Sequence, residues 1–139
     1  MIYETCSEGE TEKIGEQLAK NAKPGDVFCL KGNLGAGKTV FARGFARGLG
    51  ISADITSPTF TILNEYQGQK HCLYHFDLYR LKDPGELFGI GYEEYFYGNG
   101  VSLVEWPEIA EGLIPEDATL ITIEADFDKN PMHRRITIN

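Results

Sequence analysis

The residues with the clearest chemical potential are 32–39, Gly-Asn-Leu-Gly-Ala-Gly-Lys-Thr. They follow the apolar run 27–30 and precede residues 40–49, whose apolar spacing predicts a helix. This is the P-loop pattern G-x-x-x-x-G-K-[ST], placed between a strand and a helix. Its glycines let the backbone approach an oxyanion closely, and the N-terminus of the following helix attracts negative charge. The stretch predicts a nucleoside-triphosphate site.

Each position in this loop has an expected task. Lys38 supplies a positive charge for the β- and γ-phosphates, and the Thr39 hydroxyl is placed to bind Mg²⁺. The alternative is a glycine-rich turn that ends in a solvated lysine. Backbone contacts to the phosphates of ATP are expected from Asn33, Leu34, Gly35, Ala36 and Gly37.

Hydrolysis or phosphoryl transfer also needs an acid at the end of a neighbouring strand. Asp77 follows the apolar run 73–76, and Glu105 follows the run 101–104. Open α/β sheets bind ligands at the edge where such strands end. We assign Glu105 to Mg²⁺ together with Thr39, and Asp77 to the water shell of the metal or to the attacking water. The alternative for each is a solvated acid at a strand end.

Three further side chains lie beside these acids in the sequence. His75 shares a strand face with Asp77, and we interpret it as structural rather than catalytic. Arg80 is a candidate to pair with an acid or to contact a phosphate. Trp106 is expected on the rim of the site, packed on a loop, a base or a partner. The proline at 107 predicts extended backbone at Trp106.

The remaining sequence predicts the elements that position these residues. A capping box at residues 7–10 begins a helix, and residues 59–66 and 71–76 form a hairpin. Arg43 and Arg47 form either a solvated stripe or a contact for an acidic partner surface or an incoming phosphate. We expect an α/β fold, a single P-loop NTPase-like domain over 1–139. Its mixed central sheet has a parallel core and an antiparallel hairpin, and helices flank it. Further helices are predicted near 83–88, 92–96 and 107–110, and further strands at 101–104, 119–125 and 135–138.

Composition limits the partners and the compartment. The 139 residues carry a net charge of −8, whereas a protein that grips nucleic acid by itself usually has a basic face. No run approaches the length of a membrane span, and the N-terminus does not resemble a signal peptide. Three widely spaced cysteines favour reduced thiols and a cytoplasmic protein.

Several segments together resemble the TsaE (YjeE) family, P-loop ATPases of bacterial tRNA threonylcarbamoyladenosine biosynthesis. The resemblance covers most of the chain, and its later segments are more specific than the P-loop. They occur in the order of the family: 32–39, Ser-Pro-Thr-Phe (57–60), His-Phe-Asp-Leu-Tyr-Arg-Leu (75–81), Asp-Pro-Gly-Glu-Leu (83–87), Glu-Glu-Tyr-Phe (93–96) and Val-Glu-Trp-Pro-Glu (104–108).

This resemblance implies weak, Mg²⁺-dependent ATP hydrolysis in complex with the TsaB and TsaD proteins. TsaD performs the threonylcarbamoyl transfer, and the ATPase resets or activates the complex. It also implies a base contact near Thr11 and the C-terminal strands, with His133 or Arg134 as the candidate. Together with the net charge, it implies that the chain does not bind tRNA alone. The functional positions of the family fall on Lys38, Thr39, Thr59, Asp77, Glu105 and Trp106.

Three other functions compete with this one. A small-molecule kinase needs an acceptor pocket and a lid with arginines, and no lid insertion is visible, although Arg80 or Arg43 can contribute. A GTP-dependent switch needs an Asn-Lys-x-Asp segment, which the sequence lacks. A scaffold that binds nucleotide only as a structural ligand predicts that Asp77→Ala and Glu105→Ala leave function intact.

Overall fold

The structure is a computed structural model that describes residues 1–33, 35–56, 62–125 and 130–139. Four parallel strands form the centre of its sheet. Within the described residues the sheet has seven strands in the order β1-β7-β6-β2-β5-β4-β3. The predicted α/β class with a mixed sheet is confirmed. The parallel strands are β6 (Thr119–Ala125), β2 (Val27–Lys31), β5 (Val101–Glu105) and β4 (Leu73–Asp77); the antiparallel ones are β1 (Ile2–Thr5), β7 (Arg134–Ile138) and β3 (Leu63–Tyr66).

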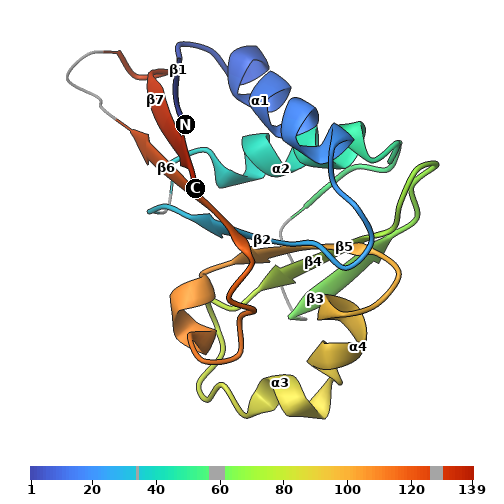
Figure 1. Cartoon of the computed structure of the whole chain (residues 1–139). Coiled ribbons are helices and arrows are strands. Elements are labelled where there is room, and N and C mark those ends of the chain that lie inside the picture. Colours follow the sequence, from blue (N-terminus) through green and yellow to red (C-terminus); the bar gives the residue numbers. More distant parts are fainter. Residues whose placement is uncertain (34, 57–61, 126–129) are drawn as a thin grey trace.

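Helices cover both faces of this sheet (Figure 1). Alternation along β2 supplies both cores: Phe28 and Leu30 pack with the helices on one face, and Val27 and Cys29 pack on the other. The first face carries α1 (Glu8–Lys20) and α2 (Lys38–Gly48); the second carries α3 (Glu86–Gly89), α4 (Tyr92–Phe96) and the 3₁₀ helix η1 (Pro107–Ala110).

The predicted capping box at the start of α1 is present. Ser7 Oγ accepts from the Glu10 backbone N–H at 3.2 Å, and Glu10 Oε1 accepts from the Cys6 N–H at 2.8 Å. Both bonds satisfy donors that the first turn of a helix leaves open. They fix the point at which the chain leaves β1 and enters α1.

Glycines let α1 and α2 approach at backbone distance. A Cβ atom added at Gly15 would lie 2.5 Å from the Phe41 carbonyl oxygen, and one at Gly44 would overlap the Glu12 carbonyl. No larger residue fits at either position without moving one of the helices. The helix that follows the P-loop is therefore held at backbone distance.

The arginine stripe of α2 pairs with α1. Arg43 lies 3.4 Å from Glu8 and 3.5 Å from Glu12; Arg47 lies 2.7 Å from Glu12 and 3.8 Å from Glu16. The carboxylates that pair with these arginines thus belong to α1 of the same chain, whereas we had considered those of a partner.

Two local predictions differ from the structure. Residues 2–5, to which we assigned no element, form β1, which pairs with β7 from Ile2↔Thr137 to Thr5↔Arg134; Ile2, Tyr3 and Thr5 favour strands, but four residues are too few to indicate one alone. The helix expected from residue 83 begins at Glu86, because Pro84 and Gly85 form a turn in which Asp83 Oδ1 accepts from the Gly85 N–H.

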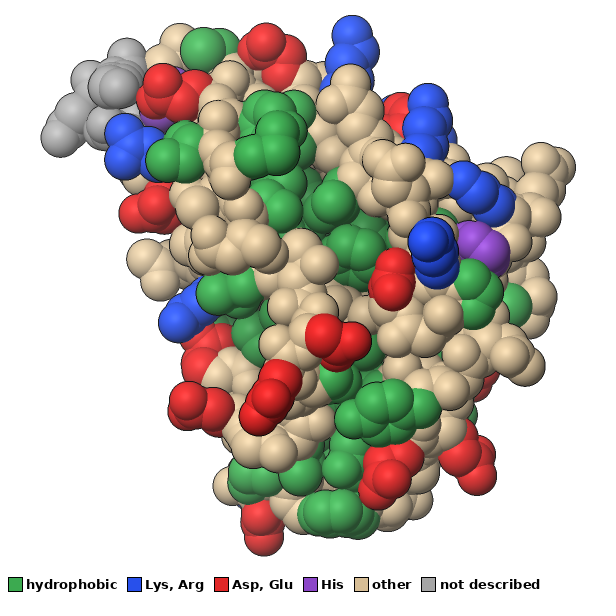
Figure 2. All heavy atoms as spheres, in the orientation of Figure 1, with side chains coloured by type: hydrophobic (Ala, Val, Ile, Leu, Met, Phe, Trp, Pro, Cys, Tyr) green, Lys and Arg blue, Asp and Glu red, His purple; other side chains and the backbone are tan. Residues whose placement is uncertain are grey.

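The surface agrees with the acidic composition. Figure 2 shows acidic side chains over the lower half of the drawn face, around α3 and α4, with most Lys and Arg side chains toward the upper right. Within the described residues, no helix has the length and apolar character needed to cross a membrane. Cys6, Cys29 and Cys72 are free thiols.

Candidate functional site

The P-loop joins β2 to α2 with its glycines in the conformation that the loop requires. Gly35 and Gly37 have φ of 81° and 100°, a region that side chains disfavour. Ala36 N–H donates to the Asn33 carbonyl at 3.0 Å, and no side chain caps the N-terminus of α2. The first N–H groups of α2 thus remain available to an anion. Leu34, also predicted to contact phosphate, lies outside the described residues.

Lys38 is buried at the start of α2, with 6% of its surface exposed. Its Nζ atom has no hydrogen-bond partner among the residues that the structure describes and lies 3.8 Å from the centroid of the Trp106 ring. Burial lowers the pKa of Lys38, while the charges of Glu105, Asp77 and Glu108 raise it. A buried ammonium without a hydrogen bond is unusual, and a phosphate oxygen would satisfy it.

Trp106 does not have the extended backbone that we predicted from the following proline. Its φ and ψ are 58° and 49°, a left-handed conformation that among the described residues no other non-glycine residue adopts. Such a backbone costs on the order of 1–3 kcal/mol, so its surroundings must hold it. The ring packs on Lys38 and on the Tyr79 ring, whose centroid is 5.0 Å away. These contacts override the local preference set by Pro107.

Asp77 and Glu105 lie side by side at the carboxyl edge of the sheet. They are register partners at the ends of β4 and β5. Asp77 Oδ1 accepts from the Tyr79 N–H at 3.1 Å. Burial raises the pKa of Asp77, the Tyr79 hydrogen bond lowers it, and the charge of Glu105 raises it again. The strand-end placement predicted from sequence is therefore present, and both carboxylates act electrostatically on Lys38.

His75 and Glu105 form a buried pair beneath this edge. His75 Nε2 lies 2.6 Å from Glu105 Oε2, and the two side chains are 1% and 3% exposed. His75 Nδ1 has no hydrogen-bond partner. Sequence reasoning treated this histidine as structural; the structure places it directly on one of the two candidate acids.

Oxygen atoms suited to Mg²⁺ surround the P-loop. Thr39 is exposed in the first turn of α2, which follows β2, and β2 pairs with β5, the strand that ends at Glu105. Over the described ranges, no group of three or more His, Cys, Asp or Glu residues could hold a metal ion. Mg²⁺ at nucleotide sites takes few protein ligands and keeps waters and phosphates, so this oxygen set fits it.

Thr11 and Arg134 come together beside the P-loop, as the predicted base contact requires. Arg134 Nε donates to the Ala36 carbonyl at 2.8 Å, and Thr11 Oγ1 lies 2.7 Å from Thr5 Oγ1. Both residues have other partners inside the chain, so contact with a base remains a prediction. They line a small pocket of about 100 Å³ with Ser7, Glu8, Gly37, Val40 and Met132.

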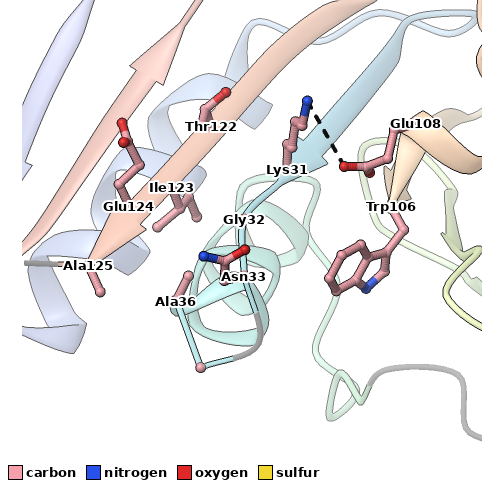
Figure 3. Close-up of a pocket in the computed structure, with 11 residues that line it drawn as sticks. Lys31, Gly32, Asn33, Ala36, Trp106, Glu108, Thr122, Ile123, Glu124 and Ala125 are labelled. Carbon is pink, nitrogen blue, oxygen red and sulfur yellow. Dashed lines mark ion pairs between the residues drawn. The ribbon is translucent and has the colours of Figure 1, made fainter.

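A larger hollow of about 460 Å³ opens on the other side of the loop. Figure 3 shows it between the end of β6 and Trp106, with the P-loop beneath. Lys31 Nζ and Glu108 Oε2 form an ion pair at 4.0 Å on the side of the hollow that carries Trp106 (Figure 3). No role was predicted for Lys31, which directly precedes the loop, or for Glu108; the base contact expected from the C-terminal strands named no residue of 122–125, which the pairing of β6 with β2 brings beside the loop.

Two other residues were predicted to take part in the site. Arg80 is exposed and forms no ion pair with any residue that the structure describes. Thr59, expected near the γ-phosphate, lies outside the described residues. Their roles stay predictions.

Comparisons with known proteins agree on one family. The family description "Threonylcarbamoyl adenosine biosynthesis protein TsaE" matches residues 5–136. The chain is 48% identical over 126 residues to the tRNA threonylcarbamoyladenosine biosynthesis protein TsaE of Bacillus subtilis (strain 168), covering 91% of this chain and 78% of that protein. It is 42% identical over 129 residues to the protein of the same name from Treponema pallidum (strain Nichols), covering 93% of each.

A solved structure shows the same fold. The crystal structure of Bacillus subtilis YdiB superposes with a TM-score of 0.79 at 41% sequence identity, covering 99% of this chain and 83% of that chain. The likeness thus extends over the whole sheet and both helical layers.

Proposed function

Because the chain belongs to the TsaE family of tRNA threonylcarbamoyladenosine biosynthesis proteins, we propose that it binds and hydrolyses ATP with Mg²⁺ in support of that modification. We further propose that it acts with the TsaB and TsaD proteins and is weakly active alone. The observation that carries the ATPase proposal is the buried Lys38 ammonium beside two strand-end carboxylates, for which the described residues supply no hydrogen-bond partner.

The residues divide the chemistry as follows. The open N–H groups of α2 and the Lys38 ammonium bind the phosphates, and Thr39 with Glu105 holds Mg²⁺. When bound, Mg²⁺ neutralises charge on the phosphate oxygens. Asp77 orients the attacking water, because its carboxylate is more exposed than that of Glu105 and lies at the same edge.

ATP turnover by the purified chain, alone and with TsaB and TsaD, tests this proposal. We expect slow turnover alone, stimulation by the partners, and loss of turnover in Lys38→Ala. Equal turnover by Lys38→Ala, or no stimulation, would contradict it.

The two acids separate hydrolysis from a scaffold role. Asp77→Asn and Glu105→Gln should abolish turnover while the protein still binds ATP, measured by calorimetry. If both variants support the tRNA modification as well as the unmodified chain does, nucleotide binding is structural and the hydrolytic proposal fails.

A further inference from the structure

The P-loop lysine and the acid at the end of β5 are oppositely charged but do not pair. Lys38 and Glu105 are both buried, they carry opposite charges, and the charge of Glu105 acts on Lys38. Opposite charges attract strongly when little water separates them. Yet within the described part of the chain the Lys38 ammonium has no hydrogen-bond partner, so Glu105 is not bonded to it.

Glu105 pairs with His75 instead of with Lys38. At 2.6 Å from Glu105 Oε2, His75 Nε2 must carry a proton, because a bare nitrogen lone pair would repel the carboxylate. The bond is charge-assisted and buried, which places it among the stronger hydrogen bonds in proteins. The ring itself is fixed within β4.

We propose that His75 is a positioning residue that holds the Glu105 carboxylate and thereby prevents it from pairing with Lys38. The Lys38 ammonium then rests on the Trp106 ring, a contact weaker than an ion pair, and stays available to a phosphate. This inference rests on the proposed nucleotide binding and adds to it a role for His75, which is to position Glu105.

Without the histidine, Glu105 would be a buried carboxylate that has lost its donor. The charge of Glu105 already acts on the Lys38 ammonium, and a pairing of the two would satisfy both groups while removing the charge that meets the phosphates. His75→Leu should therefore weaken ATP binding even without Mg²⁺, although residue 75 does not contact the nucleotide.

A second substitution separates this effect from a general structural one. Glu105→Gln removes the negative charge that captures Lys38, so His75→Leu/Glu105→Gln should bind ATP more tightly than His75→Leu alone. His75→Gln should bind like the unmodified chain, because its amide N–H₂ can still donate to Glu105. Simple damage to the fold would make the double variant no better than the single one.

The chain contains a matched control. His133 Nε2 lies 3.0 Å from Glu4 Oε1, His133 is also buried, and its Nδ1 also has no hydrogen-bond partner. This pair joins the start of β7 to β1, away from β4 and β5. His133→Leu removes the same kind of contact without freeing Glu105, so any loss of ATP affinity in that variant should not be reversed by adding Glu105→Gln.

The experiment is calorimetric titration of ATP in the presence of EDTA, with circular dichroism to establish folding. We expect about 10- to 100-fold weaker binding in His75→Leu, the equivalent of one charge-assisted hydrogen bond. We also expect recovery in the double variant. If His75→Leu does not fold, His75→Asn replaces it, because the shorter amide cannot reach Glu105. Unchanged affinity in the single variant, or no recovery in the double one, overturns the inference; no binding by the unmodified chain overturns the proposed function as well.

Discussion

The two faces of the sheet are assembled in different ways. On the α1/α2 face, backbone meets backbone at Gly15, Gly44 and Gly48, and ion pairs follow the outer edge of the contact. On the α3/α4 face, three short helical segments are held by side chains. Aromatic rings there meet edge to face, as Phe96 does with Phe76 and Tyr92 at centroid distances of 5.1 and 5.4 Å.

This difference follows from what each face must hold. The first turn of α2 carries Lys38 and Thr39, so a shift of this helix moves the phosphate site. The segments of four and five residues on the other face are too short to be stable alone and depend on packing. Glycine contacts therefore fix the position of α2, whereas aromatic contacts bury the apolar surface of the short helices.

The largest expected effect is on the aromatic face. Phe96→Ala removes a fully buried ring and should lower the free energy of unfolding by about 3–5 kcal/mol, measured by urea denaturation. ATP affinity of the folded protein should not change, because α4 does not hold the P-loop. A loss of ATP affinity in this variant would break the comparison.

On the glycine face we expect a smaller loss of stability but a change in binding. Gly44→Ala forces a methyl group into the Glu12 carbonyl, and such overpacking costs about 1–3 kcal/mol. Because α2 must shift, ATP affinity should fall as well, as calorimetry would show.

Gly89→Ala on α3 is the counterpart on the other face. A Cβ atom there meets nothing within 4 Å, so this change should stabilise the protein by about 0.4–1 kcal/mol. Equal destabilisation by both alanines would mean that the two faces do not differ.

Loss of the capping box should lower the free energy of unfolding by less than Phe96→Ala does. Ser7→Ala removes the acceptor for the Glu10 N–H at the start of α1 and should cost about 1 kcal/mol. Ser7→Asn, which retains a capping oxygen, should recover most of it in the same denaturation experiment. No difference between the two variants would show that the cap adds nothing to the glycine contacts.

The smallest effect concerns the thiol buried on the aromatic face. Burial, with a contribution from Glu108, raises the pKa of Cys29 from 9.0 to about 11. Between these values the unfolded chain loses a proton that the folded chain keeps, so this contribution to stability is complete below pH 9 and is lost as the pH rises toward 11. Cys29→Ala should flatten that part of the stability curve. A thiol reagent near neutral pH should modify exposed Cys6 but not Cys29.

Local sequence signals were sufficient for much of this fold. The P-loop, the capping box at Ser7 and the strand-end positions of Asp77 and Glu105 each depend on a few neighbouring residues, so a short pattern reveals them. The strand at residues 2–5 does not depend on neighbouring residues alone, because its partner in β7 is more than 120 residues away.

The site was less predictable where contacts cross between elements. Pro107 favours an extended Trp106, but Lys38 and Tyr79 hold its ring in place and the backbone becomes left-handed. The pair formed by His75 and Glu105 depends on the register of β4 against β5, which no local pattern specifies. The Arg134 bond to the Ala36 carbonyl likewise needs β7 to lie beside the loop.

The ring on Lys38 also gives the protein an optical property. Trp106 is the one tryptophan among its 139 residues, so all indole fluorescence arises 3.8 Å from the P-loop ammonium. Indole emission responds to a nearby charge, and a phosphate that draws Lys38 off the ring changes that charge. The unlabelled protein therefore carries its own spectroscopic reporter at the place where the phosphates of a nucleotide would bind.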